Sequence, residues 1–306
     1  MEKKKKLGFV QYFKKHYALY LMLALPILYY IIFAYVPMGG LVIAFEDYKI
    51  GKGILGSEWV GLEVFKKVFS ASKFWRAVRN TLRLNILSLF VGFPAPIILA
   101  LFLNELKNGP FKNAVQTILY LPHFVSWVII GGLVIQVFSS ESGLVNNFLR
   151  SIGLSTIPFL SEPVAWIGTY LGVSVWQSIG WGAIIYISAI AGIDQEQYEA
   201  ARVDGCNRFR MMYKITLPNI FPTIAIMLIL KIGGMIGSGL EKAMMLNNSM
   251  VTEVADVLST YTYSVGMERG QFSIATAIGL FQSVINFGLV VSANKISDKL
   301  SGESIW

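Results

Sequence analysis

Apolar segments that are nearly free of charge alternate with shorter polar segments along the whole chain. The apolar segments have about 20 residues or more, which is enough for a helix to cross a bilayer. We therefore predict an all-α polytopic membrane protein with six transmembrane helices. The predicted spans cover residues 17–45, 78–103, 114–138, 164–193, 219–239 and 271–293.

Two of the segments between the spans have helical patterns of their own. The stretch WVGLEVFKKVF, residues 59–69, repeats valine at every fourth position, which predicts an amphipathic helix at the outer interface. The stretch VADVLSTYTYSVG, residues 254–266, predicts a short helix at the outer mouth. Pro94 and Pro96 interrupt the second span, which membrane helices tolerate where neighbours satisfy the freed carbonyl groups.

Composition and charge agree with membrane embedding and set an orientation. Of the 306 residues, 55% are hydrophobic and 14% are charged, a more apolar balance than that of soluble domains. The net charge is +8, and the lysine-rich N-terminus is placed in the cytoplasm by the positive-inside rule. No basic face interleaved with aromatic residues follows, so we expect no nucleic-acid partner. We predict a basic cytoplasmic N-terminus at 1–16, a first span with its outer loop at 17–77, a core of five spans at 78–293 and a cytoplasmic tail at 294–306.

Motifs of catalysis, nucleotide binding and metal binding are missing from the sequence. It contains no HExxH, no GxSxG and no GxxxxGK[ST]. The single cysteine excludes an intrachain disulfide, and His16 and His123 stand far apart without a partner at metal-ligand spacing. We expect a transport subunit that is not an enzyme and holds no cofactor of its own.

A charged segment rich in small residues, 194–218, separates the fourth and fifth spans on the predicted cytoplasmic side. Asp194 is placed to cap a first helix, and Gly205 permits the positive φ that ends it. A second short helix is predicted over 207–214, with Phe209 on its apolar side. This helix–turn–helix favours a docking element for a soluble partner over an ordinary loop.

The same segment resembles the EAA motif of ATP-binding cassette importer permeases, EAA-x-x-DGA-x8-I-x-LP. The resemblance implies that residues 199–205 form a coupling helix that sits in a groove of an ATPase subunit. Cys206 stands where alanine is usual, which is the one departure. The matching residues are Glu199, Ala200, Ala201, Asp204, Gly205, Ile215, Leu217 and Pro218, and Phe209 joins them as a candidate coupling residue.

The resemblance extends over most of the chain. NTLRLN at 80–85, FPAPIILALFLNELKN, YLPHFVSW, GQFSIATAIGLFQSVI and the terminal GESIW are similar to the LplB-like oligosaccharide permease subgroup of the maltose-type importers. This implies a type I importer permease in the lipid of a bacterial plasma membrane. It also implies the partners: a homologous second permease, two copies of a cytoplasmic ATPase that binds ATP and Mg, an extracellular substrate-binding lipoprotein and an oligosaccharide substrate.

In maltose-type permeases, the two spans that flank the coupling loop line the transport path. Here the fourth span offers Trp176, Gln177 and Trp181, because aromatic rings stack on sugars and an amide bonds hydroxyl groups. Trp166, near the end of that span, is interpreted as an interfacial anchor. Ser238 and Arg83 complete the candidates for the substrate path, together with Lys231.

Lys231 is the most informative of these candidates. It lies about 12 residues past Pro218, or roughly 18 Å along a helix, which is near the bilayer centre. A charge at that depth is costly and usually faces a cavity or a partner. A place on the path favours an anionic substrate such as a uronate-bearing oligosaccharide, whereas the alternatives are an acid of the sister subunit or snorkelling outward. Gly233 and Gly237 form a GxxxG pattern beside it, which allows close helix packing.

These patterns predict one transmembrane subunit of an ATP-driven oligosaccharide importer that works by alternating access. A cation-coupled secondary sugar transporter is the alternative, but it needs acids within the membrane, and the predicted spans contain almost none. A scaffold that only recruits an ATPase is the third reading, and Lys231 counts against it.

Overall fold

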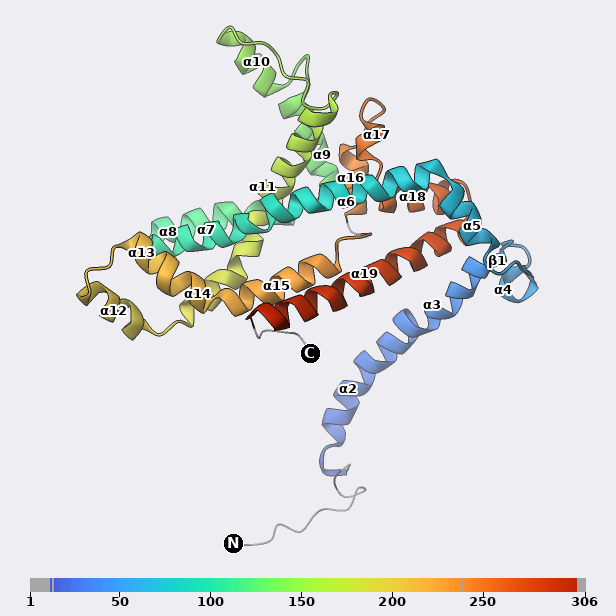
Figure 1. The fold of residues 1–306 in the computed structure, drawn as a ribbon, viewed down its shortest axis with the longest axis horizontal. Coiled ribbons are helices and arrows are strands. Elements are labelled where there is room, and N and C mark those ends of the chain that lie inside the picture. The colour runs from blue at the N-terminus through green and yellow to red at the C-terminus, as the bar shows by residue number, and fades with distance from the viewer. Residues whose placement is uncertain (1–11, 13, 238, 302–306) are drawn as a thin grey trace.

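The computed structural model describes residue 12 and residues 14–237 and 239–301, and this part of the chain is almost entirely helical. Long helices lie side by side in a bundle, and shorter helices gather at its ends (Figure 1). Four helices of this part are long and apolar enough to cross a membrane, and there are up to six such spans if each of two bent helix pairs forms one. The prediction of an all-α polytopic membrane protein is confirmed.

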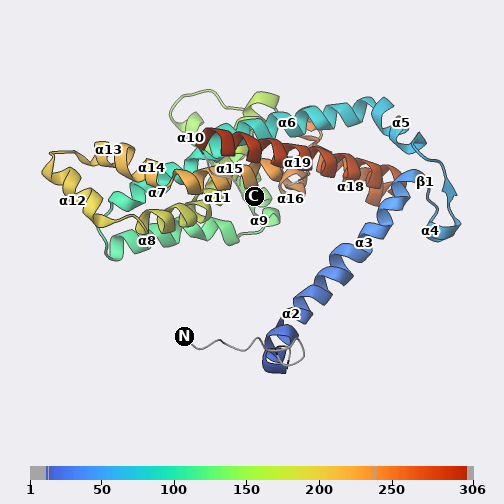
Figure 2. The same ribbon diagram turned by 60° about the horizontal axis from the view of Figure 1, so that its bottom comes forward.

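The first span runs from Tyr17 to Phe45 and matches the predicted range. It leaves the bundle at an angle, and its N-terminal half stands well apart from the other helices (Figures 1 and 2). Its apolar side chains are mostly exposed, so this surface is suited to lipid or to another membrane subunit. The span consists of α2 (Tyr17–Tyr30), η1 (Ile31–Tyr35), α3 (Val36–Met38) and η2 (Gly39–Phe45).

The second, fourth and sixth spans are long helices whose ends differ from the predicted ends. The second begins at Ser72 instead of residue 78, and the sixth continues to Ser301 through most of the predicted tail. Proline interrupts the second span as predicted, because one helix ends at Gly92 and the next begins at Pro94. The helices are α6 (Ser72–Gly92), α7 (Pro94–Glu105), α11 (Pro163–Ala191) and α19 (Phe272–Ser301).

The third and fifth spans are bent, which the sequence did not predict. The third bends by 104° after Phe124, and the fifth bends by 60° at Ile220. The fifth span therefore restarts at Phe221, three residues after Pro218, and its helix ends at Gly233 instead of residue 239. The third span comprises α8 (Pro110–Tyr120), η3 (Leu121–Phe124) and α9 (Trp127–Phe138), and the fifth comprises α13 (Arg208–Met211), η4 (Met212–Thr216), α14 (Leu217–Asn219) and α15 (Phe221–Gly233).

Short elements cover the end of the bundle at which α6 begins. Helix α5 (Glu63–Ser70) buries Val64 and Val68, which confirms the amphipathic helix, and it packs on α6 and α19. Helix α18 (Leu258–Tyr263) confirms the short helix predicted within 254–266. Strands β1 (Glu46–Asp47) and β2 (Glu58–Trp59) pair antiparallel beside them. The other short helices are α4 (Gly53–Gly56), α10 (Leu144–Ser151), α16 (Leu240–Leu246), α17 (Thr252–Ala255) and η5 (Ser264–Glu268).

Two glycines let neighbouring spans approach closely. A Cβ atom on Gly180 of α11 would overlap the backbone of Leu119, so the fourth and third spans touch there. A Cβ atom on Gly233 would lie 2.5 Å from the Val290 side chain of α19, which confirms the close packing predicted for this glycine. At Gly180 any side chain would collide with backbone, whereas at Gly233 it would have to displace the Val290 side chain.

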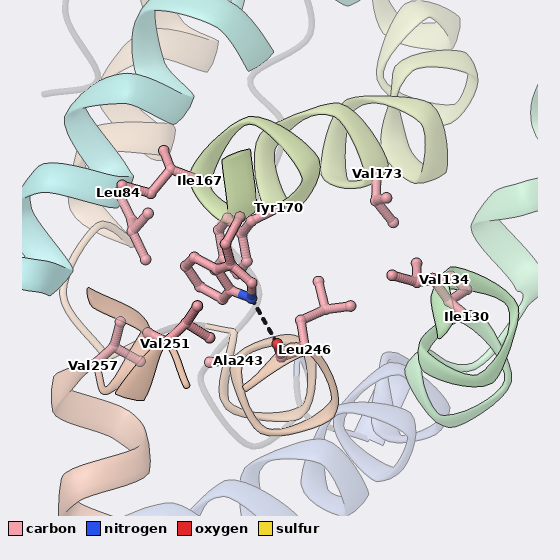
Figure 3. Close-up of a cluster of buried hydrophobic side chains, with 12 residues drawn as sticks. Leu84, Ile130, Val134, Ile167, Tyr170, Val173, Ala243, Leu246, Val251 and Val257 are labelled. Atoms are coloured by element: carbon pink, nitrogen blue, oxygen red, sulfur yellow. Dashed lines mark hydrogen bonds between the residues drawn. The ribbon is translucent and has the colours of Figure 1, made fainter. Parts of the chain in front are cut away.

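Trp166 of α11 belongs to a buried cluster that also includes residues of the short helices α16 and α17, and Figure 3 shows this cluster. Its side chain is 1% exposed, and its indole N–H donates to the Leu246 carbonyl oxygen at 2.7 Å. The prediction that Trp166 is an interfacial anchor is therefore wrong. Its hydrogen bond instead fixes the segment after the fifth span to the fourth span.

Trp166→Phe should lower the melting temperature of the protein in detergent. The change keeps a large ring but leaves the buried Leu246 carbonyl without its donor, at a cost of about 1–3 kcal/mol. Trp176→Phe is the matched control, because Trp176 is 48% exposed in the same helix. Equal melting temperatures for the two variants would contradict a structural role for the indole hydrogen bond.

Candidate functional site: a coupling surface and a transport path

The segment between the fourth and fifth spans forms the predicted helix–turn–helix at one end of the bundle (Figure 1). Helix α12 (Gln195–Val203) begins after Asp194, whose side chain accepts a hydrogen bond from the Glu196 N–H at 3.0 Å. Asn207 caps α13 in the same way, accepting from the Arg210 N–H at 2.8 Å. Both helix starts are therefore fixed locally by a side chain that the sequence places directly before the helix.

The turn between α12 and α13 is held by two nested backbone hydrogen bonds. The Gly205 N–H donates to the Arg202 carbonyl oxygen at 3.0 Å, and the Cys206 N–H donates to the Ala201 carbonyl oxygen at 2.9 Å. This is the Schellman pattern, and it requires the left-handed φ of +74° that Gly205 adopts. A small apolar residue often follows such a glycine and packs back on the helix, which accounts for the partly buried Cys206.

The outer surface of the helix–turn–helix combines charged and apolar groups. Glu199, Ala200 and Asp204 are exposed, whereas Ala201 is buried against the rest of the protein. Apolar side chains stand out around the turn and have no cover from the described part of the chain: Val203 is 89%, Phe209 73% and Tyr213 65% exposed. We call residues 199–213 the coupling surface.

The remaining motif residues connect this surface to the helix bundle. Ile215 and Leu217 pack against a buried cluster of α7, α11 and α15, in which Ile220 is fully buried. The Tyr198 hydroxyl lies 2.9 Å from the Thr216 hydroxyl and joins the two arms. Pro218 is exposed at the foot of the second arm. Packed side chains and the hydroxyl contact therefore connect the coupling surface to the fourth and fifth spans.

Two candidate path residues hold the bend of the third span. The Gln177 amide donates to the His123 carbonyl oxygen at 3.3 Å, and the Trp181 ring stacks on the His123 imidazole with centroids 4.6 Å apart. The contacts explain why the chain turns here. The fourth span supplies the Gln177 amide as a hydrogen-bond donor and the Trp181 ring as a stacking surface to His123 of η3, directly before the break. A role in the path stays a prediction for both residues.

The other candidates lie on different surfaces. Trp176 lines a hollow of about 660 Å³ whose other walls are almost wholly apolar, including Ile130 and Phe138 of α9. A hollow of that composition offers a sugar few hydrogen-bond partners. Arg83 is exposed on α6, and Ser238 lies outside the described residues.

Lys231 is exposed near the end of α15, and a second lysine lies close enough for the two positive charges to interact. This is Lys242 of α16, whose ammonium group lies 4.4 Å from the centre of the Tyr170 ring and 5.9 Å from that of Trp127. Neither lysine forms a salt bridge with a carboxylate of the described residues. The two lysines thus concentrate positive charge, and cation–π contacts with two aromatic rings hold the Lys242 ammonium group in place.

Residues 92–301 match the family of binding-protein-dependent transport system inner membrane components. This match and the fold define the class of the protein: it is a type I permease subunit of an ATP-binding cassette importer. The chain belongs to that family, and its similarity to individual members extends beyond the matched residues.

Two relatives from Bacillus subtilis (strain 168) cover nearly the whole chain. Protein LplB is 43% identical over 94% of this chain and 91% of its own length. The polygalacturonan/rhamnogalacturonan transport system permease protein YteP is 42% identical over 100% of this chain and 94% of its own length.

Two solved structures share the fold. A bacterial transporter for the acidic polysaccharide alginate has a chain with a TM-score of 0.87 and 40% identity, covering 94% of this chain and 98% of that one. The second is a bacterial alginate transporter in complex with a periplasmic protein that holds an alginate pentasaccharide. Its matching chain has a TM-score of 0.89 and 39% identity, covering 97% of this chain and 99% of that one.

Proposed function

We propose that this chain is one permease subunit of an ATP-driven importer for acidic, uronate-containing oligosaccharides. The observation that carries the proposal is the pair Lys231 and Lys242, two cations that no carboxylate of the described chain balances. A charge in such a place is retained where it meets a substrate or a partner. The names of YteP and of the alginate transporter refer to acidic polysaccharides, which supports the same substrate class.

Coupling to ATP is proposed to enter through the coupling surface. The exposed Val203 and Phe209 offer apolar anchors, and Glu199 and Asp204 offer charged contacts, to a groove of a cytoplasmic ATPase. Closure of the two ATPases would move α12, and the packed Ile215 and Leu217 would pass this motion to the spans. The path then alternates between outward and inward access, and the permease chain itself performs no hydrolysis.

The proposed assembly follows from this coupling. A homologous second permease completes the path, two ATPase copies bind ATP and Mg, and an extracellular binding lipoprotein delivers the oligosaccharide. The coupling surface then faces the cytoplasm of a bacterium, together with both termini, and the opposite end of the bundle faces outward. We call that opposite end the outer end.

Transport by the complete, reconstituted transporter tests the function. Vesicles with ATP at the ATPase side should take up uronate oligosaccharides, from galacturonate and alginate series, at least about tenfold faster than their methyl esters of the same length. The esters are neutral, so the comparison isolates the carboxylate. Equal uptake of acid and ester would contradict the proposed acidic specificity.

The same vesicles distinguish the cation-coupled alternative. Replacement of ATP by a non-hydrolysable analogue should stop uptake, and an imposed proton or sodium gradient should not restore it. Gradient-driven uptake without ATP would instead support a secondary transporter.

A further inference from the structure

A second polar site lies at the outer end of the bundle, away from the coupling surface. It is a cavity of about 470 Å³, a size typical of small-molecule sites, between the start of α6 and the segment from α16 to η5. Amide, hydroxyl and charged side chains supply most of its wall. Met244 is the one aliphatic side chain among the described lining residues, and Tyr261 and Tyr263 add aromatic surface, so the wall combines hydrogen-bonding groups with apolar area, which suits a sugar.

Positive charge in this cavity is not fully balanced. Arg76 lies 4.0 Å from the Asp256 carboxylate, which also accepts a hydrogen bond from Thr260. Lys73 and Arg269 line the same cavity and form no salt bridge with any described acid. Glu268 is the other acid of the wall, and it accepts a hydrogen bond from Ser264 at 2.7 Å. Three cations and two acids of the described chain thus line the cavity, which leaves one net positive charge, and Lys73 and Arg269 are the cations that no salt bridge holds.

The start of helix α6 reinforces this positive field. Its first turn contains no acidic residue, and no side chain caps it, so its free N–H groups and the helix dipole favour an anion there. Lys73 lies in that turn, and Arg76 lies in the next one. Cations at a helix start are repelled by the helix dipole. An anionic ligand in the cavity would stabilise both the cationic side chains and the helix N-terminus.

Two buried polar atoms in the cavity wall have no hydrogen-bond partner in the described chain. One is the Arg76 Nε donor, and the other is the Asn247 Oδ1 acceptor. An unpaired buried atom costs free energy unless a ligand or water satisfies it. Both atoms lie beneath the surface of the wall, so the groups that face the cavity are the charged, amide and hydroxyl side chains around them.

We propose that this cavity is an entry subsite that receives a uronate residue of the oligosaccharide at the outer end of the permease. Lys73 and Arg269 hold the carboxylate, and the amide and hydroxyl groups of the wall bond the ring hydroxyls. The inference rests on the proposed function and adds a second binding position, distinct from Lys231 and Lys242. A docking loop of the binding protein is the alternative occupant, and its loss would reduce uptake of acidic and neutral substrates alike.

The double variant Lys73→Met with Arg269→Gln tests the subsite in the complete reconstituted transporter. The substrate is the uronate oligosaccharide that the wild type takes up best, and its methyl ester provides the neutral comparison. We expect kcat/KM for uptake of the acid to fall about tenfold, because charge-assisted hydrogen bonds are lost. Uptake of the ester and the affinity of the vesicles for the loaded binding protein should stay within about twofold.

The matched control removes two positive charges from the same end of the bundle but outside the cavity. Lys52→Met with Lys67→Met changes exposed lysines of the outer loop and should leave uptake of both substrates unchanged. An equal fall for acid and ester with weaker binding-protein affinity would overturn the subsite and indicate a docking surface. Unchanged uptake of the acid in the double variant would also overturn it, with the proposed function intact. Failure of the wild type to take up any uronate oligosaccharide would overturn the proposed function first.

Discussion

Gly205→Val should reduce ATP-driven uptake to below about a tenth of the wild-type rate, whereas Gly205→Asn should keep most of it. The residue adopts a φ of +74°, which a β-branched side chain disfavours strongly and asparagine tolerates. An added Cβ would meet no atom within 4 Å, so the lower uptake rate of Gly205→Val would come from strain in the backbone of the turn and not from a steric clash. The turn would open, and α12 and α13 would present a different surface to the ATPase.

The matched control is Gly153→Val at the other end of the bundle. Gly153 has a φ of +77° and equally open surroundings, so the substitution imposes the same local strain away from the coupling surface. Uptake by vesicles and the ATPase activity that the loaded binding protein stimulates are the two measurements. Full coupled uptake by Gly205→Val, or an equal loss in Gly153→Val, would contradict a specific role of this turn in coupling.

Local features of the coupling segment were readable from the sequence because they are fixed by neighbouring residues. The cap at Asp194 and the turn at Gly205 depend on side chains and φ values within a few positions of each other. The position of Cys206 became clear only in the structure, where its backbone N–H completes the turn and its side chain is partly buried.

The bends of the third and fifth spans could not be read from hydropathy. The segment around His123 is apolar on both sides of the break, so it counts as one continuous span. The contacts of Gln177 and Trp181 with His123 are 54 and 58 positions apart in sequence and exist only in the folded bundle. Trp166 was misjudged for the same reason, since Leu246 supplies its partner from a segment 80 positions away.

Lys242 was missed because it lies in a segment that hydropathy assigns to an outer loop. A lysine in a loop attracts no notice, whereas Lys231 stands out within an apolar run. Its cation–π contacts come from Trp127 and Tyr170, which belong to two other spans. The signal that was available is the proximity of Lys242 to the end of the fifth span, eleven positions after Lys231.

Lys242→Met should lower uptake of an acidic oligosaccharide about a hundredfold, because a partly buried contact between unlike charges is lost. Uptake of the neutral methyl ester should be unchanged or faster, because the variant no longer carries a desolvated charge beside Tyr170. Lys242→Arg keeps the positive charge and the contact with the ring, so it should retain most of the uptake. Lys231→Met should have a smaller effect, about tenfold, because Lys231 is exposed and its charge is better screened.

The ratio of acid uptake to ester uptake decides between a substrate contact and a contact with the sister subunit. If Lys242 binds a carboxylate of the substrate, Lys242→Met lowers the ratio of acid uptake to ester uptake, because the ester lacks the charge that Lys242 binds. If Lys242 instead pairs with an acid of the sister subunit, Lys242→Met leaves the ratio unchanged. The loss of that ion pair would then reduce uptake of both substrates and assembly of the two permeases. Co-purification of the sister subunit with Lys242→Met therefore belongs beside the uptake measurement. A normal complex with an altered ratio supports the substrate contact, and a dissociated complex with an unaltered ratio contradicts it.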